Sequence, residues 1–224
     1  ALGLLLTIIL YANNNYQKIL PALSVIISFG LFFTFSRGAW LAFLVGLLIY
    51  LITDRKIKST LPLLATIIIS WIILGLLFSP LINSRLDNNQ TSLNGRSNQE
   101  RISQLQTATD NFKNNPLFGV GFNNYSHNLY LNNPNLPIYD YRRVENIYLL
   151  ILNELGIIGL SLLLLLLLTV LIKTIKEKNF SSLSLIIVLL SLGLFYHYLL
   201  SQYQGLMLFF IILSLGLINN KNQL

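Results

Sequence analysis

Long apolar runs separated by short polar segments dominate the hydrophobic pattern of this chain. Runs of roughly 17 to 22 residues recur, and a helix that rises about 1.5 Å per residue crosses a hydrocarbon core of about 30 Å at that length. The pattern predicts membrane-spanning helices near residues 19–35, 39–52, 60–79, 147–172, 182–201 and 205–218. Residues 1–11 form a shorter apolar run, which we interpret as the end of a helix in a longer protein.

The composition agrees with this prediction. Hydrophobic residues make up 54% of the 224 residues and charged residues only 10%, and the mean hydropathy is +0.65. These values are typical of an integral membrane protein. Cysteine is absent, which excludes disulfide bonds, thiolate metal sites and a cysteine nucleophile within the chain. The two histidines lie far apart, so we expect no metal or other cofactor, and the net charge of +7 requires no nucleic acid partner.

Lysine gathers in two short polar connections, at residues 55–58 and 173–178. Basic residues mark the cytoplasmic connections of membrane proteins, so the long connection at residues 80–145 is expected outside the cytoplasm. The predicted fold is all-α, a polytopic transmembrane helix bundle with a large extracytoplasmic loop that contains a short amphipathic helix. Residues 1–79 supply the first helices, residues 80–145 the catalytic loop, and residues 146–224 further helices and a short cytoplasmic tail.

Arginine is distributed differently from lysine. With this orientation, six of the seven arginines fall on the outer side, whereas seven of the eight lysines fall inside. Orientation alone does not separate the two residue types. The planar guanidinium group suits bidentate contacts with phosphate, so the distribution suggests a phosphate ligand outside. Contact with lipid headgroups or with water is the alternative.

Within the long loop, Ser97 and Glu100 have the spacing of a capping box, which predicts that a helix begins at Ser97. One face of this helix would carry the apolar residues Ile102, Leu105, Ala108 and Phe112, so the helix should lie on the membrane surface or pack on the spans.

Arg96 would then precede the helix and Arg101 would lie in its first turn. Two guanidinium groups beside free N–H groups make a plausible anion site. The alternative is an amphipathic surface helix with ordinary flanking charge. The nearby Gly119-Val120-Gly121 is a lone G-x-G, which we interpret as a turn rather than a nucleotide cradle.

Glu145 stands where the loop enters the membrane, and this position would partly remove its carboxylate from water. A carboxylate there can act as a general base toward a hydroxyl group. An ion pair with Arg142 or Arg143 is the alternative. Glu154 lies about two turns deeper and should face protein or a cavity rather than lipid. His197, near the outer end of its expected span, is either a packed aromatic neighbour or part of the site.

Five motifs occur in the order seen in bacterial O-antigen ligases and O-antigen polymerases, and the chain resembles that superfamily over residues 19–172. The motifs are FSRGAWL at 35–41, GRSNQER at 95–101, NPLFGVG at 115–121, NIYL at 146–149 and ELGIIG at 154–159. The resemblance implies a multi-pass glycosyltransferase in the bacterial inner membrane, active in lipopolysaccharide or related polysaccharide biosynthesis. Its donor would be a glycan linked to undecaprenyl pyrophosphate, its acceptor a glycan or lipid, and it would need neither nucleotide sugar nor metal.

The resemblance also implies roles for individual residues. Family arginines that match Arg37 and Arg96 are thought to hold the pyrophosphate, and Arg101 is expected to assist them. In the NIYL motif, Asn146 and Tyr148 are expected to contact substrate. His197 lies outside the motifs and is a further candidate for substrate binding.

One position departs from the family pattern. Many relatives place a histidine directly before the Asn-x-Tyr-Leu motif, where it engages the acceptor hydroxyl, and this chain has Glu145 there. His127 precedes a similar Asn-Leu-Tyr-Leu sequence, but no Glu-Leu-Gly follows it. We therefore expect Glu145 to be the catalytic base of an altered acceptor site, with His127 as the second candidate.

Two other functions remain open at this stage. The first is a transporter of a small anion or a glycan-related solute, because some cyanobacterial relatives carry that name. Transporters often contain broken helices and ionisable residues near the midplane of the membrane, whereas only Glu154 and His197 lie within the expected spans here. The second is a non-catalytic protein of glycan binding or assembly. The motifs do not distinguish a ligase from a polymerase.

Overall fold

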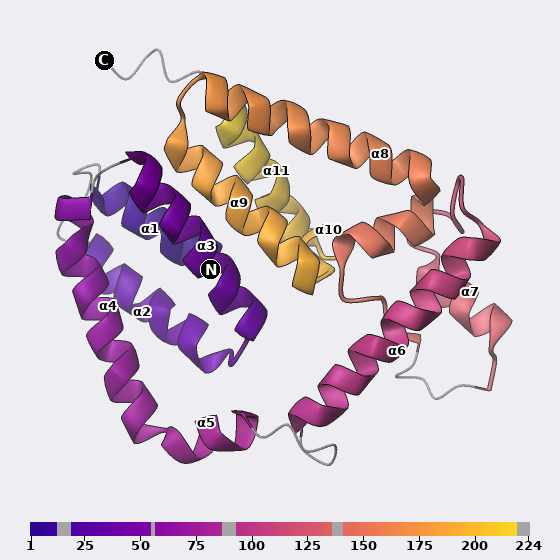
Figure 1. Ribbon diagram of the computed structural model, residues 1–224, viewed down its shortest axis with the longest axis horizontal. Coiled ribbons are helices and arrows are strands. Elements are labelled where there is room, and N and C mark those ends of the chain that lie inside the picture. The colour runs from indigo at the N-terminus through magenta and orange to yellow at the C-terminus, as the bar shows by residue number, and fades with distance from the viewer. Residues whose placement is uncertain (13–18, 55–56, 87–92, 136–140, 219–224) are drawn as a thin grey trace. The chain divides into compact units, whose positions relative to one another are not determined.

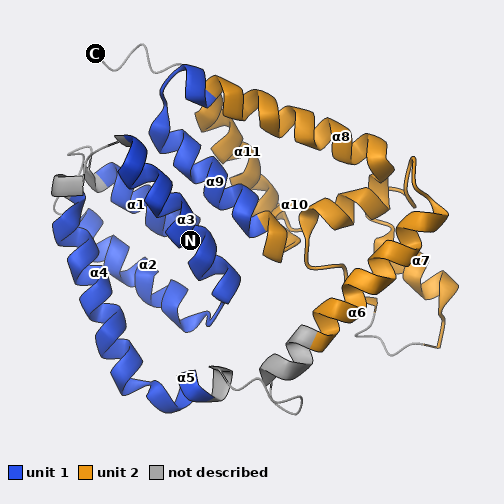
Figure 2. Cartoon of the chain, in the orientation of Figure 1, with its two compact units in different colours: residues 1–95, 174–192, 218–224 blue, residues 96–173, 193–217 orange. Residues whose placement is uncertain are grey.

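A computed structural model describes residues 1–12, 19–54, 57–86, 93–135 and 141–218, and within them every regular element is a helix. The chain divides into two units, coloured separately in Figure 2. Unit 1 contains residues 1–95, 174–192 and 218–224, and unit 2 contains residues 96–173 and 193–217. The all-α prediction is confirmed, since 83% of the described residues are helical.

The helices follow the apolar runs of the sequence, with boundaries that shift by a few residues (Figure 1). They are α1 Leu2–Ala12, α2 Leu20–Phe33, α3 Arg37–Asp54, α4 Ile57–Leu77, α5 Ser79–Leu86, α6 Leu93–Asn114, α7 Tyr125–Asn132, α8 Ile147–Lys176, α9 Phe180–Phe195, α10 Tyr198–Ser201 and α11 Tyr203–Leu217.

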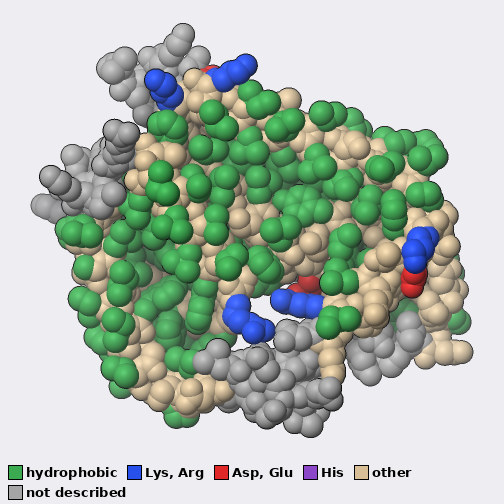
Figure 3. Space-filling view, viewed as in Figure 1, with side chains coloured by type: hydrophobic (Ala, Val, Ile, Leu, Met, Phe, Trp, Pro, Cys, Tyr) green, Lys and Arg blue, Asp and Glu red, His purple; other side chains and the backbone are tan. Residues whose placement is uncertain are grey.

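Two helices are long and apolar enough to cross a membrane, over Thr60–Leu77 in α4 and Ile147–Lys176 in α8. Few side chains of either stretch are buried, so neither resembles the core helix of a soluble protein. The helices α2, α3, α9 and α11 are apolar but shorter. Hydrophobic side chains are spread across the face in Figure 3. A bundle in which all of these helices span, and the outer position of the loop, remain predictions.

In unit 1, α1 packs on α2, α3 and α4. The turn between α2 and α3 is fixed by aromatic packing, because the Phe32 ring stacks on Trp40 with centroids 5.9 Å apart. The Trp40 indole N–H donates to the Leu31 carbonyl at 2.9 Å. The Ser36 hydroxyl accepts from the Ala39 N–H at 3.1 Å and so caps α3. This cap places Arg37 at the first position of the helix.

The structure corrects the expected start and length of the loop helix. This helix, α6, begins at Leu93 and has 22 residues, so it is not short, and Ser97 lies inside it rather than at its cap. Extending a formed helix by another turn costs little, and residues 93–96 continue it. Arg96 therefore lies in the first turn of α6 rather than before it, and Arg101 lies more than one turn further along the helix. Of the expected apolar face, Ala108 is buried but Ile102 and Leu105 are exposed.

Two expected continuous spans are interrupted. The helix α9 ends at Phe195, and α10 begins at Tyr198. In α8, Gly156 has φ 68° and ψ −169°, which separates residues 147–155 from residues 157–176. Figure 1 shows the two pieces of α8 running in different directions.

Candidate functional site

A small hydrophobic core in unit 2 holds the residues before α8 against α6 and α7. Ala108 of α6, Tyr125 and Leu129 of α7, Val144, and Leu150 of α8 are buried together. Burial raises the pKa of the Tyr125 hydroxyl to about 12, so this group stays neutral at physiological pH. Because Val144 belongs to the core, the chain segment that leads into α8 is held close to α6.

The break in α8 is filled by the loop at residues 116–121. The N–H of Val120 donates to the Asn153 carbonyl, and the N–H of Gly121 donates to the Glu154 carbonyl, each at 2.9 Å. After the break, the N–H of Ile157 donates to the Pro116 carbonyl at 2.9 Å. The loop thus satisfies the backbone groups that an interrupted helix leaves without partners.

Two glycines permit this contact. A Cβ atom on Gly156 would overlap the Leu117 carbonyl, and one on Gly119 would lie 2.5 Å from the Asn153 carbonyl oxygen. Both have positive φ, 68° and 66°. The NPLFGVG and ELGIIG motifs therefore bind one another, and the interpretation of the G-x-G as a turn is confirmed.

We expect Gly156→Ala to lower the free energy of unfolding by roughly 2–5 kcal/mol, because alanine at positive φ is strained and its methyl group would displace the loop. Thermal unfolding of the full-length protein in detergent measures this. Gly75→Ala in α4 is the control, since its Cβ would meet nothing within 4 Å and alanine favours a helix by roughly 0.5–1 kcal/mol. Equal stability of the Gly156 variant and the parent would contradict the role given to the break.

Glu145 forms an ion pair with Arg101 of α6. The Arg101 Nη2 and Glu145 Oε2 atoms lie 3.1 Å apart, and the side chains are 41% and 40% exposed. The Glu145 N–H also donates to Gln104 Oε1 at 3.4 Å. One face of α6 therefore positions both the carboxylate and the backbone of Glu145, and the carboxylate reaches water.

The ion-pair partners that the sequence suggested for Glu145 were wrong. Arg142 Nη1 lies 4.0 Å from Glu100 Oε2, and Arg143 donates to the Asn123 Oδ1 atom. Packing of the core brings α6 alongside residues 144–146, so a partner 44 positions away contacts Glu145 instead of its sequence neighbours.

Glu154 faces protein, as expected. Its side chain is buried at the end of the first piece of α8, and its Oε2 accepts from the Asn123 N–H at 2.9 Å. Asn123 has φ 64°, a conformation that asparagine tolerates better than most residues. Since the Asn123 side chain also accepts from Arg143, this residue links the buried carboxylate to the arginine beside Val144.

His197 lies between α9 and α10, next to these charged groups. Its Nδ1 is 2.6 Å from Ser201 Oγ, and its ring packs edge-on against Tyr198 with centroids 6.0 Å apart. The charged groups of Arg143 and Glu145 lie close enough to this ring to interact with it electrostatically. His197 is therefore a packed aromatic neighbour that also lies within electrostatic range of the Glu145 carboxylate.

Asn146 and Tyr148 make structural contacts at the start of α8. The Asn146 Oδ1 accepts from the Leu149 N–H at 3.0 Å, and its Nδ2 donates to the Leu194 carbonyl at 3.1 Å. The Tyr148 ring packs close to Gly193. Asn146 thus caps α8 and ties it to the end of α9, and direct contact of either residue with substrate stays a prediction.

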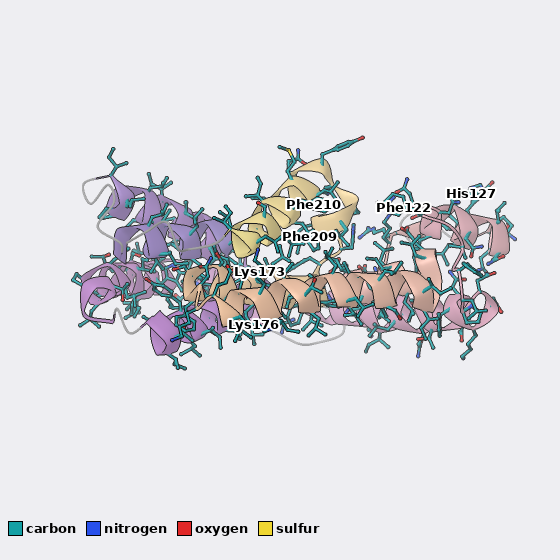
Figure 4. All side chains as sticks on the ribbon, turned by 90° about the horizontal axis from the view of Figure 1, so that it is seen from above. Phe122, His127, Lys173, Lys176, Phe209 and Phe210 are labelled. Carbon is teal, nitrogen blue, oxygen red and sulfur yellow. The ribbon has the colours of Figure 1, made fainter. Side chains whose placement is uncertain are left out.

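Three further predicted site residues are Arg37, Arg96 and His127. Arg37 is exposed and belongs to unit 1. Arg96 lies in α6, and its side chain is outside the described residues. His127 is exposed on α7, and Figure 4 shows Phe122 and His127 toward the end of α8 that is opposite Lys173.

Sequence reasoning missed Gln104, Asn123 and Ser201, which position Glu145, Glu154 and His197. Only Asn123 carried a local signal, because an asparagine after a glycine turn is suited to positive φ. Gln104 and Ser201 are ordinary polar residues whose contacts arise from packing. Among the described residues, no three histidine, aspartate or glutamate side chains gather to hold a metal ion.

A protein-family model described as O-antigen ligase matches residues 22–164, which is more than half of the chain. The matched residues include both glycine motifs of the α8 break, as well as Arg101 and Glu145. No curated protein and no solved structure matches the chain significantly.

Proposed function

The chain belongs to the O-antigen ligase family, and from this premise we propose that it transfers an oligo- or polysaccharide from an undecaprenyl pyrophosphate carrier to a hydroxyl group on a glycan or lipid. Members of the family are embedded in membranes and act on lipid-linked glycans. The observation that supports the proposal most is the Arg101–Glu145 pair, in which a guanidinium group lies 3.1 Å from a carboxylate. Guanidinium groups suit bidentate contacts with phosphate, and a carboxylate can act as a general base.

On the donor side, arginine would hold the pyrophosphate. Arg101 is the candidate whose surroundings are described, beside Glu145. The family motif makes Arg37, at the positive end of α3, a candidate for the same role. Arg96 is the third candidate. Pyrophosphate is a good leaving group once its charge is held, so much of the catalysis would come from positioning and electrostatic stabilisation. No metal is required for this scheme.

On the acceptor side, Glu145 would remove the proton from the attacking hydroxyl. The hydroxyl oxygen then forms the new bond to the anomeric carbon, and the bond from that carbon to the pyrophosphate oxygen breaks with its electron pair. An incoming pyrophosphate competes with Glu145 for Arg101, so donor binding would release the carboxylate for the acceptor. Asn146 and Tyr148 lie at this end of α8, and His197 lies near it, so these three residues are the candidates for contact with the acceptor. His127 is the second candidate for the base.

Transport is the second candidate function, because α8 is broken beside the buried Glu154. Broken helices next to ionisable residues are typical of transporters. Two contacts favour the enzyme. The break is occupied by residues 116–121 of the chain itself, and Glu154 already accepts from the Asn123 N–H.

Deletion of the full-length gene tests the function. Gel analysis of the surface glycan should show loss of long chains, with carrier-linked polymer accumulating if the protein is a ligase. Single repeat units on the final acceptor would indicate a polymerase. An unchanged glycan would contradict the enzyme and favour transport.

The location in the inner membrane, with residues 80–145 outside the cytoplasm, is part of the proposal. We expect cysteines introduced at Asn135 and at Lys176 to react with membrane-impermeant reagents from opposite sides, because the lysine-rich end of α8 should be cytoplasmic. Labelling of intact cells, compared with labelling of inverted vesicles, measures this. Reaction of both positions in intact cells would overturn the orientation.

A further inference from the structure

The exposure of apolar side chains changes at Gly156. After the break, α8 exposes large side chains such as Ile157, Leu162 and Leu165, with Leu162 at 63%. Before the break, Ile147 and Leu150 are buried, and the other apolar side chains of the helix are at least partly covered. The surface of α8 that suits lipid therefore begins at the break and not at the start of the helix.

The two pieces of α8 also differ in length and in packing. The second piece, residues 157–176, has about the 20 residues that cross a hydrocarbon core of about 30 Å. The first piece shares the core of α6 and α7 through Leu150, which packs with Ala108 and Tyr125. The first piece thus belongs with the polar helices of unit 2, and the second piece alone is sufficient as a span.

The loop that fills the break carries apolar side chains of its own. Leu117, Phe118 and Phe122 are exposed, the two phenylalanines at 74% and 70%. The Ile158 N–H donates to the Leu117 carbonyl at 3.5 Å, so the backbone of this loop lies beside the first lipid-facing turn of the second piece. Phenylalanine and leucine side chains on a membrane-facing surface insert at the boundary between the lipid headgroups and the acyl chains.

We propose that the membrane boundary passes through Gly156, so that residues 157–176 span and the side chains of Leu117, Phe118 and Phe122 insert into the adjoining lipid leaflet. The helices α6 and α7, with residues 147–155, then lie on the membrane surface. The partner is a lipid bilayer for two reasons. The second piece of α8 is long and apolar enough to cross a bilayer, and the exposed apolar side chains of the loop adjoin its exposed apolar surface. The inference needs membrane embedding but not the proposed transfer reaction.

The proposed boundary determines the depth of the candidate site relative to the membrane. Nine helical residues, about 14 Å at most, separate Ile147 from the boundary. Glu145 and Arg101 would therefore lie near the lipid headgroups, the level at which the pyrophosphate of a lipid carrier is found. Glu154 would lie at the boundary rather than two turns inside the membrane.

The test uses single-cysteine variants of the full-length protein, kept otherwise cysteine-free and labelled with an environment-sensitive fluorophore in phosphatidylcholine vesicles. Spin-labelled lipids report the depth of the fluorophore, and iodide reports its contact with water. Ile157→Cys decides the boundary. With a boundary at Gly156, shallow spin labels should quench it best, and deep labels should quench Leu166→Cys best.

If the span instead began at Ile147, position 157 would lie about 15 Å deep, at the bilayer centre, and the deep labels would quench it best. That result would overturn the boundary.

Phe118→Cys and Phe122→Cys test the loop, with Asn135→Cys as the exposed polar control. We expect a blue shift, quenching by shallow spin labels and loss of iodide quenching at 118 and 122, and the opposite at 135. Iodide quenching at 118 and 122 equal to that at 135 would overturn insertion and indicate water or another protein as the neighbour. Because depth is measured in the absence of substrate, these results are independent of whether the protein transfers glycan.

Discussion

Replacing Glu145 with glutamine is expected to lower the rate of glycan transfer by about two to four orders of magnitude, the scale of losing a general base. Glutamine keeps the size of the side chain but cannot accept the hydroxyl proton at neutral pH. Donor binding should change little, because the arginines remain. The measurement is transfer by purified full-length protein, normalised to folded protein. Glu145→His should retain part of the activity, since imidazole is the group that relatives place at this position.

The Arg101–Glu145 ion pair offers a rival explanation for any loss. An exposed pair of this kind contributes about 0–1 kcal/mol, so a purely structural Glu145 would leave the turnover of each folded molecule nearly normal. Glu100→Gln is a matched control. Glu100 lies on α6 directly before Arg101, and its carboxylate forms a second exposed ion pair, with Arg142. An unchanged rate in Glu145→Gln would remove it as the base and make His127 the next residue to test.

Replacing Arg37 with alanine is expected to abolish transfer while the protein remains in the membrane. Arg37 stands at the capped N-terminus of α3, where its guanidinium group and the helix dipole both favour a phosphate. Arg37→Lys should restore little activity, because an ammonium group cannot make the bidentate contact. Transfer rate and donor binding should be measured together, because the proposal expects the variant to bind the pyrophosphate-linked donor poorly.

Arg142→Ala is the control for Arg37, because Arg142 is an exposed arginine of unit 2 whose described partner is Glu100 at 4.0 Å. It should keep near-normal transfer. If Arg37→Ala and Arg142→Ala were equally active, Arg37 would have no part in holding the donor, and the pyrophosphate proposal would rest on Arg96 and Arg101.

The sequence determined the positions and type of the helices, because the lengths of apolar runs and the rise of a helix are local properties. The boundaries of α2, α4 and α11 differ from the expected spans by no more than a few residues. The motifs also determined the family, which the match over residues 22–164 confirms. The turn at Gly119 to Gly121 was predictable too, since a lone G-x-G suits positive φ.

Only the tertiary structure decided where α8 breaks and what surrounds Glu145. The run at residues 147–172 reads as one span because Gly156 is also compatible with a helix. Its positive φ is favoured only once the backbone of residues 116–121 supplies partners for the interrupted helix. Arg101 likewise contacts Glu145 because a core of residues from α6, α7 and α8 brings them together. Contacts between distant segments depend on three-dimensional packing, which the local pattern of polar and apolar residues does not specify.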